Sequence, residues 1–308
     1  MQKETHPFLR ILIWLGLFFM SHVLAIIIWS FSLPDTAKAI QIITEGFNDL
    51  ETYKDQLFSL QFITHLTTFL LVAIYYITYI EKKNLNTYLG FNVKIKPVYF
   101  LLTIGLLFSC QPIVMLLVEG FKNFPLPASW HSYLLLSHET AEYTTKTLLQ
   151  FESPFQFFLG FLMVGIFAGF GEEITFRGII QKLFHDWFKN IHTAIIMSSL
   201  IFSLLHGITY NLLGIWFIGA LLGYIYYFTG NLWFSILFHF LNNTIQIVSL
   251  YFFQLGILKE DYSSVVYYSI PLSIISLICT TGIIFLFNKF KNPNFNQYQF
   301  ITFKNNPN

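Results

Sequence analysis

The chain has 308 residues, of which 55% are apolar and only 11% are charged, whereas ordinary soluble domains carry about 25% charged residues. This composition excludes a soluble domain with a large core and indicates an integral membrane protein. The net charge of +1 gives no indication of nucleic-acid binding, so we expect no nucleic-acid partner and take the lipid bilayer as the surroundings of the chain.

Eight apolar stretches approach or exceed the ~20 residues that a helix needs to cross a bilayer. In chain order, we expect spans at Phe8–Leu33, Leu57–Ile80, Val98–Val118, Phe155–Phe184, Ile191–Tyr210, Leu212–Phe228, Leu232–Phe253 and Val266–Asn288. The sequence therefore predicts an all-α, polytopic membrane protein with about eight transmembrane helices.

The distribution of basic residues orients these spans. If the N-terminus and every second loop are cytoplasmic, only five of the 17 Lys and Arg residues fall on the outer side, namely Lys38, Lys54, Lys122, Lys146 and Lys259. Because cytoplasmic loops carry the excess of Lys and Arg, we expect a multi-pass protein of the cell (plasma or inner) membrane with both termini in the cytoplasm.

We expect three parts along the chain. Residues 1–153 hold three transmembrane helices and two long outer loops, and residues 154–254 form a core of four transmembrane helices. Residues 255–308 hold the last transmembrane helix and a polar, Asn-rich cytoplasmic tail. In the second outer loop, residues 134–151 suit an interfacial helix.

Two adjacent carboxylates, Glu172 and Glu173, lie inside the fourth span. An ionisable group at that depth costs roughly 2.5–3.5 kcal/mol on insertion scales, so it is retained for pairing, for a wet cavity or for chemistry. Arg177 is four residues after Glu173 and shares its helix face, whereas Glu172 points about 100° away and is left as a candidate general base. The alternative is a structural salt bridge at the membrane edge.

Three further polar side chains lie in nearby spans. Between Thr193 and Tyr210, His206 is the only titratable residue, and His239 and Asn243 are four residues apart on one helix face. Each of them alone is as consistent with a hydrogen bond between helices as with catalysis. Counting ~1.5 Å per residue, we expect Glu172 and His239 at similar depth and His206 several ångströms deeper, unless its helix enters the membrane late.

Other intramembrane chemistries fit the sequence less well. A zinc protease with the H-E-x-x-H pattern would need a second His after His138 and Glu139, where Glu142 stands. An aspartyl protease needs two intramembrane Asp residues, and no Asp lies in mid-span. Ser203 and Ser235 lie within regular apolar helices instead of the exposed turn that a nucleophilic serine needs. A Glu–His pair that activates water remains.

These residues resemble the CAAX prenyl endopeptidase and bacteriocin-processing family (CPBP, or Abi) of intramembrane glutamic proteases. That family carries three motifs, EExxxR, FxxxH and HxxxN/D, in consecutive spans. The matching strings here are Glu172-Glu173-Ile-Thr-Phe-Arg177, Phe202-Ser-Leu-Leu-His206 and His239-Phe-Leu-Asn-Asn243. The resemblance covers about residues 155–250 and implies that residues 154–254 form a CPBP-like catalytic helix bundle.

The resemblance also implies a role for each motif residue. Glu172 and His206 are expected to activate the attacking water. His239 and Asn243 are expected to stabilise the oxyanion, and the Glu173–Arg177 pair to organise the site. No cofactor is expected; zinc held by two histidines and a glutamate is the alternative, for which the recognised ligand spacing is missing.

Members of this family cut prenylated CaaX proteins, and others are linked to bacteriocin immunity or peptide processing. We therefore expect a CAAX-protease-like endopeptidase that acts on a peptide or a membrane-protein segment. Two other classes stay open. One is a non-catalytic immunity or binding protein that uses the same polar cavity, and the other is a transporter, although no broken helix pair or inverted repeat is visible.

Overall fold

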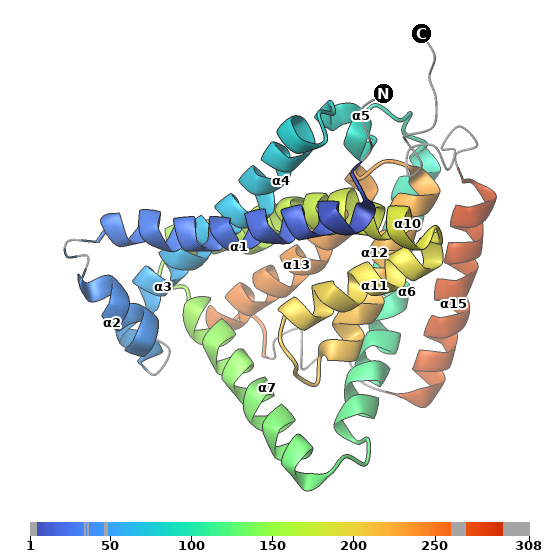
Figure 1. Ribbon diagram of the computed structural model, residues 1–308. Helices are drawn as coiled ribbons and strands as arrows, with labels where there is room; N and C mark the ends of the chain where they lie inside the picture. The colour runs from blue at the N-terminus through green and yellow to red at the C-terminus, as the bar shows by residue number, and fades with distance from the viewer. Residues whose placement is uncertain (1–4, 34, 36, 46–48, 260–268, 292–308) are drawn as a thin grey trace.

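The computed structural model describes residues 5–33, 35, 37–45, 49–259 and 269–291. Within these residues all regular structure is helical, which confirms the all-α prediction (Figure 1). Seven helices are long and apolar enough to cross a membrane, so the chain is a multi-pass membrane protein. They are Pro7–Phe31, Leu50–Ile80, Pro97–Lys122, Pro154–Phe188, Leu212–Thr229, Trp233–Gln254 and Ile270–Lys289.

The predicted span Ile191–Tyr210 differs from the others because its helix, α11, covers only Ile191–Leu205. At ~1.5 Å per residue this helix is about 22 Å long, short of the ~30 Å hydrocarbon core. It ends at His206, and Gly207 follows with a φ of +96°, in the left-handed region that favours glycine. Among the described residues, seven of the predicted spans therefore correspond to helices long enough to cross a membrane and the eighth to this shorter apolar helix, in agreement with the prediction of about eight.

Two of the long helices are composites of α- and π-helical segments. The second consists of α3 (Leu50–His65), η1 (Leu66–Leu71), α4 (Val72–Tyr75) and η2 (Tyr76–Ile80). The fourth consists of α8 (Pro154–Gly160), η3 (Phe161–Ala168), α9 (Gly169–Glu173), η4 (Ile174–Ile180) and α10 (Gln181–Phe188). Because π-helical turns are rare and often occur at functional sites, the two around α9 direct attention to its carboxylates.

The remaining helices complete the bundle and its connections. They are α1 (Pro7–Phe31), α2 (Ala37–Glu45), α5 (Leu85–Leu89), α6 (Pro97–Lys122), α7 (Ala128–Leu148), α12 (Leu212–Thr229), α13 (Trp233–Gln254) and α15 (Ile270–Lys289). Figure 1 shows α15 alongside α6, and α7 running back from the end of α6 toward α3. The helix α7 matches the helix expected in the second outer loop. The start of the last predicted span at Val266 and the expected polar tail lie outside the described residues.

Small residues let three segments meet around α9. A Cβ atom on Gly169 would lie 3.2 Å from the backbone nitrogen of Phe240 in α13. A Cβ atom on Gly171 would lie 3.1 Å from the Cβ of Phe69 in η1. Both contacts are closer than ordinary packing between side chains allows, so glycine at these two positions brings α13 and η1 against the carboxylate-bearing turn.

Polar contacts join helix ends at one side of the bundle. Arg10 of α1 binds Glu81, which follows η2, at 2.7 Å and Asp186 of α10 at 2.8 Å. The Nζ atom of Lys96, just before α6, donates to the carbonyl of Phe290, just after α15. The start of α1 and the end of α15 therefore lie on the same side as the loops that the sequence predicts to be cytoplasmic.

Candidate active site

The two adjacent carboxylates are both buried. Glu172 is 5% exposed and Glu173 is 0% exposed, and both lie in the short α-helical turn α9 between η3 and η4. An ionised carboxylate at such a place requires partners, because removal from water without compensation costs several kcal/mol. The two acids obtain their partners from different helices, and this difference separates their chemistry.

Glu173 is the paired acid. Its Oε1 atom accepts from Nη1 of Arg177 at 2.7 Å, as the four-residue spacing predicted. The guanidinium is 1% exposed, donates from Nη2 to the carbonyl of Gly219 at 3.0 Å, and lies 4.6 Å from the ring centre of Phe202. A Cβ on Gly219 would lie 3.4 Å from Nη2 and 3.1 Å from the Cβ of Ser199, so glycine eases the close approach of α12 there. This arrangement fixes Glu173 in place.

His239 connects the two acids. Its Nδ1 atom lies 2.9 Å from Oε1 of Glu173, and its Nε2 atom lies 3.9 Å from Oε2 of Glu172. The Glu173 carboxylate is paired with Arg177 and can only accept, so Nδ1–H of His239 donates to it. With Nδ1 bound to Glu173, the other ring nitrogen of His239, Nε2, is free of that contact and faces Glu172.

His206 approaches Glu172 from a second helix. It is the residue at which α11 ends, and its Nδ1–H donates to the carbonyl of Phe202 at 2.8 Å. A carbonyl can only accept, so Nε2 is again the free ring nitrogen, and it lies 3.9 Å from Oε2 of Glu172. The side chain is 37% exposed, which gives the cluster its most open edge.

The Oε2 atom of Glu172 is therefore the centre of the cluster. It is buried, accepts no hydrogen bond from the described residues, and faces the two Nε2 atoms at 3.9 Å each. A gap of 3.9 Å is too long for a direct hydrogen bond and short enough for one bridging water. The structure thus brings Glu172, His206 and His239 together around a position that suits a water molecule.

Asn243 lies one turn beyond His239 on α13 and is not part of this contact set. Its Nδ2 atom donates to the carbonyl of Val164 in η3 at 2.9 Å, and its Oδ1 atom lies 3.5 Å from Nδ2 of Asn242. An amide NH₂ has two hydrogens, so one remains for another acceptor. In the described residues Asn243 makes no hydrogen bond to Glu172, His206 or His239.

Sequence reasoning missed His65, which makes the shortest contact to Glu172. Its Nε2 atom lies 2.8 Å from Oε1 of the carboxylate, across 107 residues of sequence. A signal was present, because His65 is the only His, Lys, Arg, Asp or Glu between Leu57 and Ile80. No spacing rule connects it to the acids, and only packing of α3 and η1 against α9 reveals the contact.

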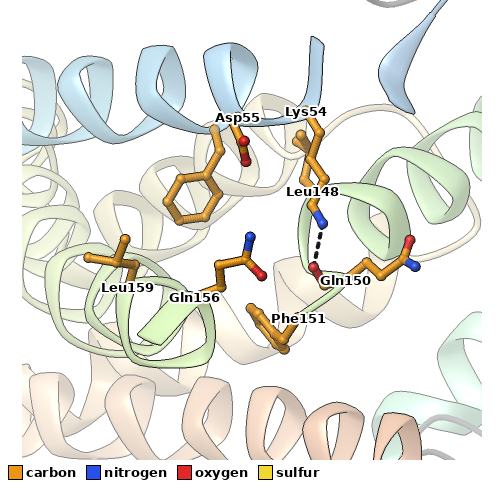
Figure 2. A pocket seen from close by; sticks show the side chains of 8 residues that line it. Lys54, Asp55, Leu148, Gln150, Phe151, Gln156 and Leu159 are labelled. Atoms are coloured by element: carbon orange, nitrogen blue, oxygen red, sulfur yellow. Dashed lines mark hydrogen bonds between the residues drawn. The ribbon is translucent and has the colours of Figure 1, made fainter. Parts of the chain in front are cut away.

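Two other features of the described residues bear on ligands. A pocket between α3 and α8 contains none of the motif residues; Figure 2 shows Lys54 reaching across it to the Gln150 carbonyl. No group of three or more His, Cys, Asp or Glu residues is arranged to hold a metal ion in the part of the chain that the structure describes. Tetrahedral zinc ligands lie about 3.3–3.4 Å apart at their binding atoms, closer than the 3.9 Å found here.

The helical bundle and this buried Glu–His–Arg cluster define a multi-pass membrane protein with an ionisable site inside its apolar helices. Residues 154–245 match the family model described as type II CAAX prenyl endopeptidase, Rce1-like. This match confirms the resemblance predicted from the three motifs and supports an endopeptidase of the CAAX-protease type. It covers α8 to most of α13 and leaves α1–α7 and α15 outside. No curated protein and no solved structure matches the chain.

Proposed function

We propose that this protein is an intramembrane glutamic endopeptidase that hydrolyses a peptide bond with a water activated by Glu172 and His206 and an oxyanion bound by His239 and Asn243. The observation that carries the proposal is the buried Oε2 atom of Glu172, which has no hydrogen-bond partner among the described residues and faces two imidazole nitrogens at 3.9 Å. The family match to residues 154–245 supports the same reaction class.

In the first step Glu172 acts as general base. A water at Oε2 gives one proton to the carboxylate and is oriented by Nε2 of His206, while its oxygen attacks the carbonyl carbon of the substrate. A carbon–oxygen bond forms, and the carbonyl electron pair moves to its oxygen to give a tetrahedral oxyanion. When this intermediate collapses, the carbon–nitrogen bond breaks and the proton on Glu172 passes to the leaving amine.

The oxyanion requires donors, and α13 supplies two. Nε2 of His239 can donate when the ring is doubly protonated, and the Glu173 carboxylate at Nδ1 is the counter-ion for that form. Asn243 lies one turn further along α13 with one amide hydrogen left over. Preorganised donors of this kind contribute roughly 10²–10³ in rate each.

The proposed substrate is a peptide or a segment of another membrane protein. The membrane proteomes and peptidomes of cells with the wild-type protein and with Glu172→Gln test this, because the variant keeps the shape and removes the base. We expect fragments present with the wild-type protein to be absent with the variant at equal protein abundance. Identical fragments in both would contradict hydrolysis and favour the non-catalytic binding protein.

A further inference from the structure

His65 holds the oxygen of Glu172 that the reaction does not use. The carboxylate has two oxygens, and His65 takes Oε1 at 2.8 Å while Oε2 remains directed at His206 and His239. A carboxylate oxygen accepts, so Nε2 of His65 carries the proton. The contact therefore restricts rotation of the carboxylate at the buried end of the side chain.

The surroundings of His65 keep it in that position. Its ring lies 4.7 Å from the ring of Phe69, one turn later in η1. The carbonyl of Phe69 in turn accepts from the hydroxyl of Thr175 in η4 at 3.0 Å. Gly171 permits this approach, since a Cβ there would lie 3.1 Å from Phe69. The segments around His65 are thus packed against α9 and hydrogen-bonded to η4, which follows it.

We propose that His65 is a positioning residue of the hydrolytic site, which donates to Glu172 Oε1 and thereby directs Oε2 at the attacking water. This inference rests on the proposed function. It places part of the site in α3, outside the segment 154–245 that matches the family model. The N-terminal helices then complete the site as well as enclosing it.

Three variants of the full-length protein test the inference. His65→Leu removes the donor with little change in volume, and His65→Gln keeps an N–H donor at similar reach. His22→Leu is the matched control, because His22 is also a partly buried histidine of an apolar helix but contacts Thr68 at 3.3 Å. Turnover of a substrate found by the Glu172→Gln comparison is measured for each, per amount of folded protein.

We expect His65→Leu to lower kcat about 10–100-fold with KM within about twofold, because misplacing a reacting group by about 1 Å has an effect of this size. His65→Gln is expected to recover most of that loss, and His22→Leu to match the wild type. A structural role alone would lower the folded fraction in both His65 variants without the recovery by Gln.

The outcomes separate the two proposals. Wild-type kcat in His65→Leu, together with an inactive Glu172→Gln, would overturn the positioning role and leave the proposed function intact. Equal loss in His65→Leu and His65→Gln would also overturn it. If Glu172→Gln changes no fragment in cells, the proposed function and the role of His65 fail together.

Discussion

At the scale of single residues, two adjacent glutamates of the same α-helical turn have different surroundings. Glu173 binds both Arg177 and His239 through its Oε1 atom, while its Oε2 atom is buried without a hydrogen-bond partner among the described residues. Glu172 receives a donor only at Oε1 and keeps Oε2 open toward two histidines. Although the two acids are adjacent in sequence, we therefore propose a structural role for Glu173 and a reactive role for Glu172.

Glu172→Gln tests the reactive acid. The amide keeps the size of the side chain and removes the base, so we expect proteolysis to fall ~10²–10⁴-fold while the protein remains folded. The rate of substrate cleavage measures the activity, and the gel-filtration profile of the protein in detergent measures whether it is folded. Full activity of Glu172→Gln with a folded but inactive Glu173→Gln would show that the two roles are reversed.

Arg177→Ala tests the structural acid. The change leaves a fully buried carboxylate without its guanidinium partner, which costs ~3–5 kcal/mol. We therefore expect a lower yield of folded protein and a lower midpoint of thermal unfolding than for Glu172→Gln. Both variants are prepared from equal amounts of cells and compared side by side. Lys146→Ala is a suitable control because its pair with Glu142 is exposed, and exposed pairs contribute about 0–1 kcal/mol. Equal stability of the Arg177 and Lys146 variants would contradict the assigned role.

The question of metal dependence concerns the same residues. We propose metal-free catalysis, since the Nε2 atoms of His206 and His239 each lie 3.9 Å from Oε2 of Glu172, farther than the binding atoms of zinc ligands lie from each other. Purified protein is expected to keep its activity after dialysis against a strong chelator. The zinc alternative would be established if the purified protein held one zinc ion per chain, lost its activity when a chelator removed the zinc, and regained it when zinc was added back.

At the scale of elements, the short helix α11 determines where His206 lies. The helix ends at His206, and the backbone turns at Gly207 with a φ of +96°. In a helix long enough to cross the membrane, the residue at position 206 would lie within the helix and not at its end. The end of the helix instead presents His206 to Glu172 with its side chain 37% exposed.

Gly207→Ala tests this turn. A Cβ at this position meets only Thr209, at 3.8 Å, so any effect arises from the left-handed backbone and not from crowding. We expect a loss of roughly 1–2 kcal/mol in stability and a larger fall in activity, because relaxation of the backbone displaces His206. Gly282→Ala is the control, since it lies in the helix α15 with open space around it. Equal effects of both changes would show that the turn is not critical.

At the scale of the whole molecule, the helix ends on one side are connected by polar contacts. Arg10 joins α1 to Glu81 and Asp186, and Lys96 joins the start of α6 to the end of α15. The distribution of the basic residues predicts that this side faces the cytoplasm. The composite helices α3–η2 and α8–α10 then descend from it and carry His65 and Glu172 into the bundle.

Cysteine labelling in intact cells tests the orientation. In a background with exposed Cys279 replaced by Ser, single cysteines at Lys94, Lys289 and Thr145 report on both sides, since all three positions are exposed. We expect a membrane-impermeant reagent to label only Thr145→Cys until the cells are opened. Labelling of Lys94→Cys and Thr145→Cys under the same conditions would contradict the predicted topology.

The sequence by itself determined the features that depend on local order along one helix. The lengths of the apolar stretches predict a polytopic α-helical protein, and the spacing of Glu173 and Arg177 predicts their ion pair. The three motifs also indicate a resemblance to the CAAX endopeptidase family, and the family model that matches residues 154–245 confirms it. Each of these inferences requires only the period of a helix or the order of residues.

Only the tertiary structure decided which side chains from different helices meet. The contact of His65 with Glu172, the bond of His239 to Glu173 and the use of Asn243 on the Val164 carbonyl all cross between segments. These contacts depend on helix tilt, on the π-helical turns beside α9 and on the close approach that glycines permit. Hydrophobic period records which face of a helix is apolar, but it does not record which neighbour that face meets or at what depth.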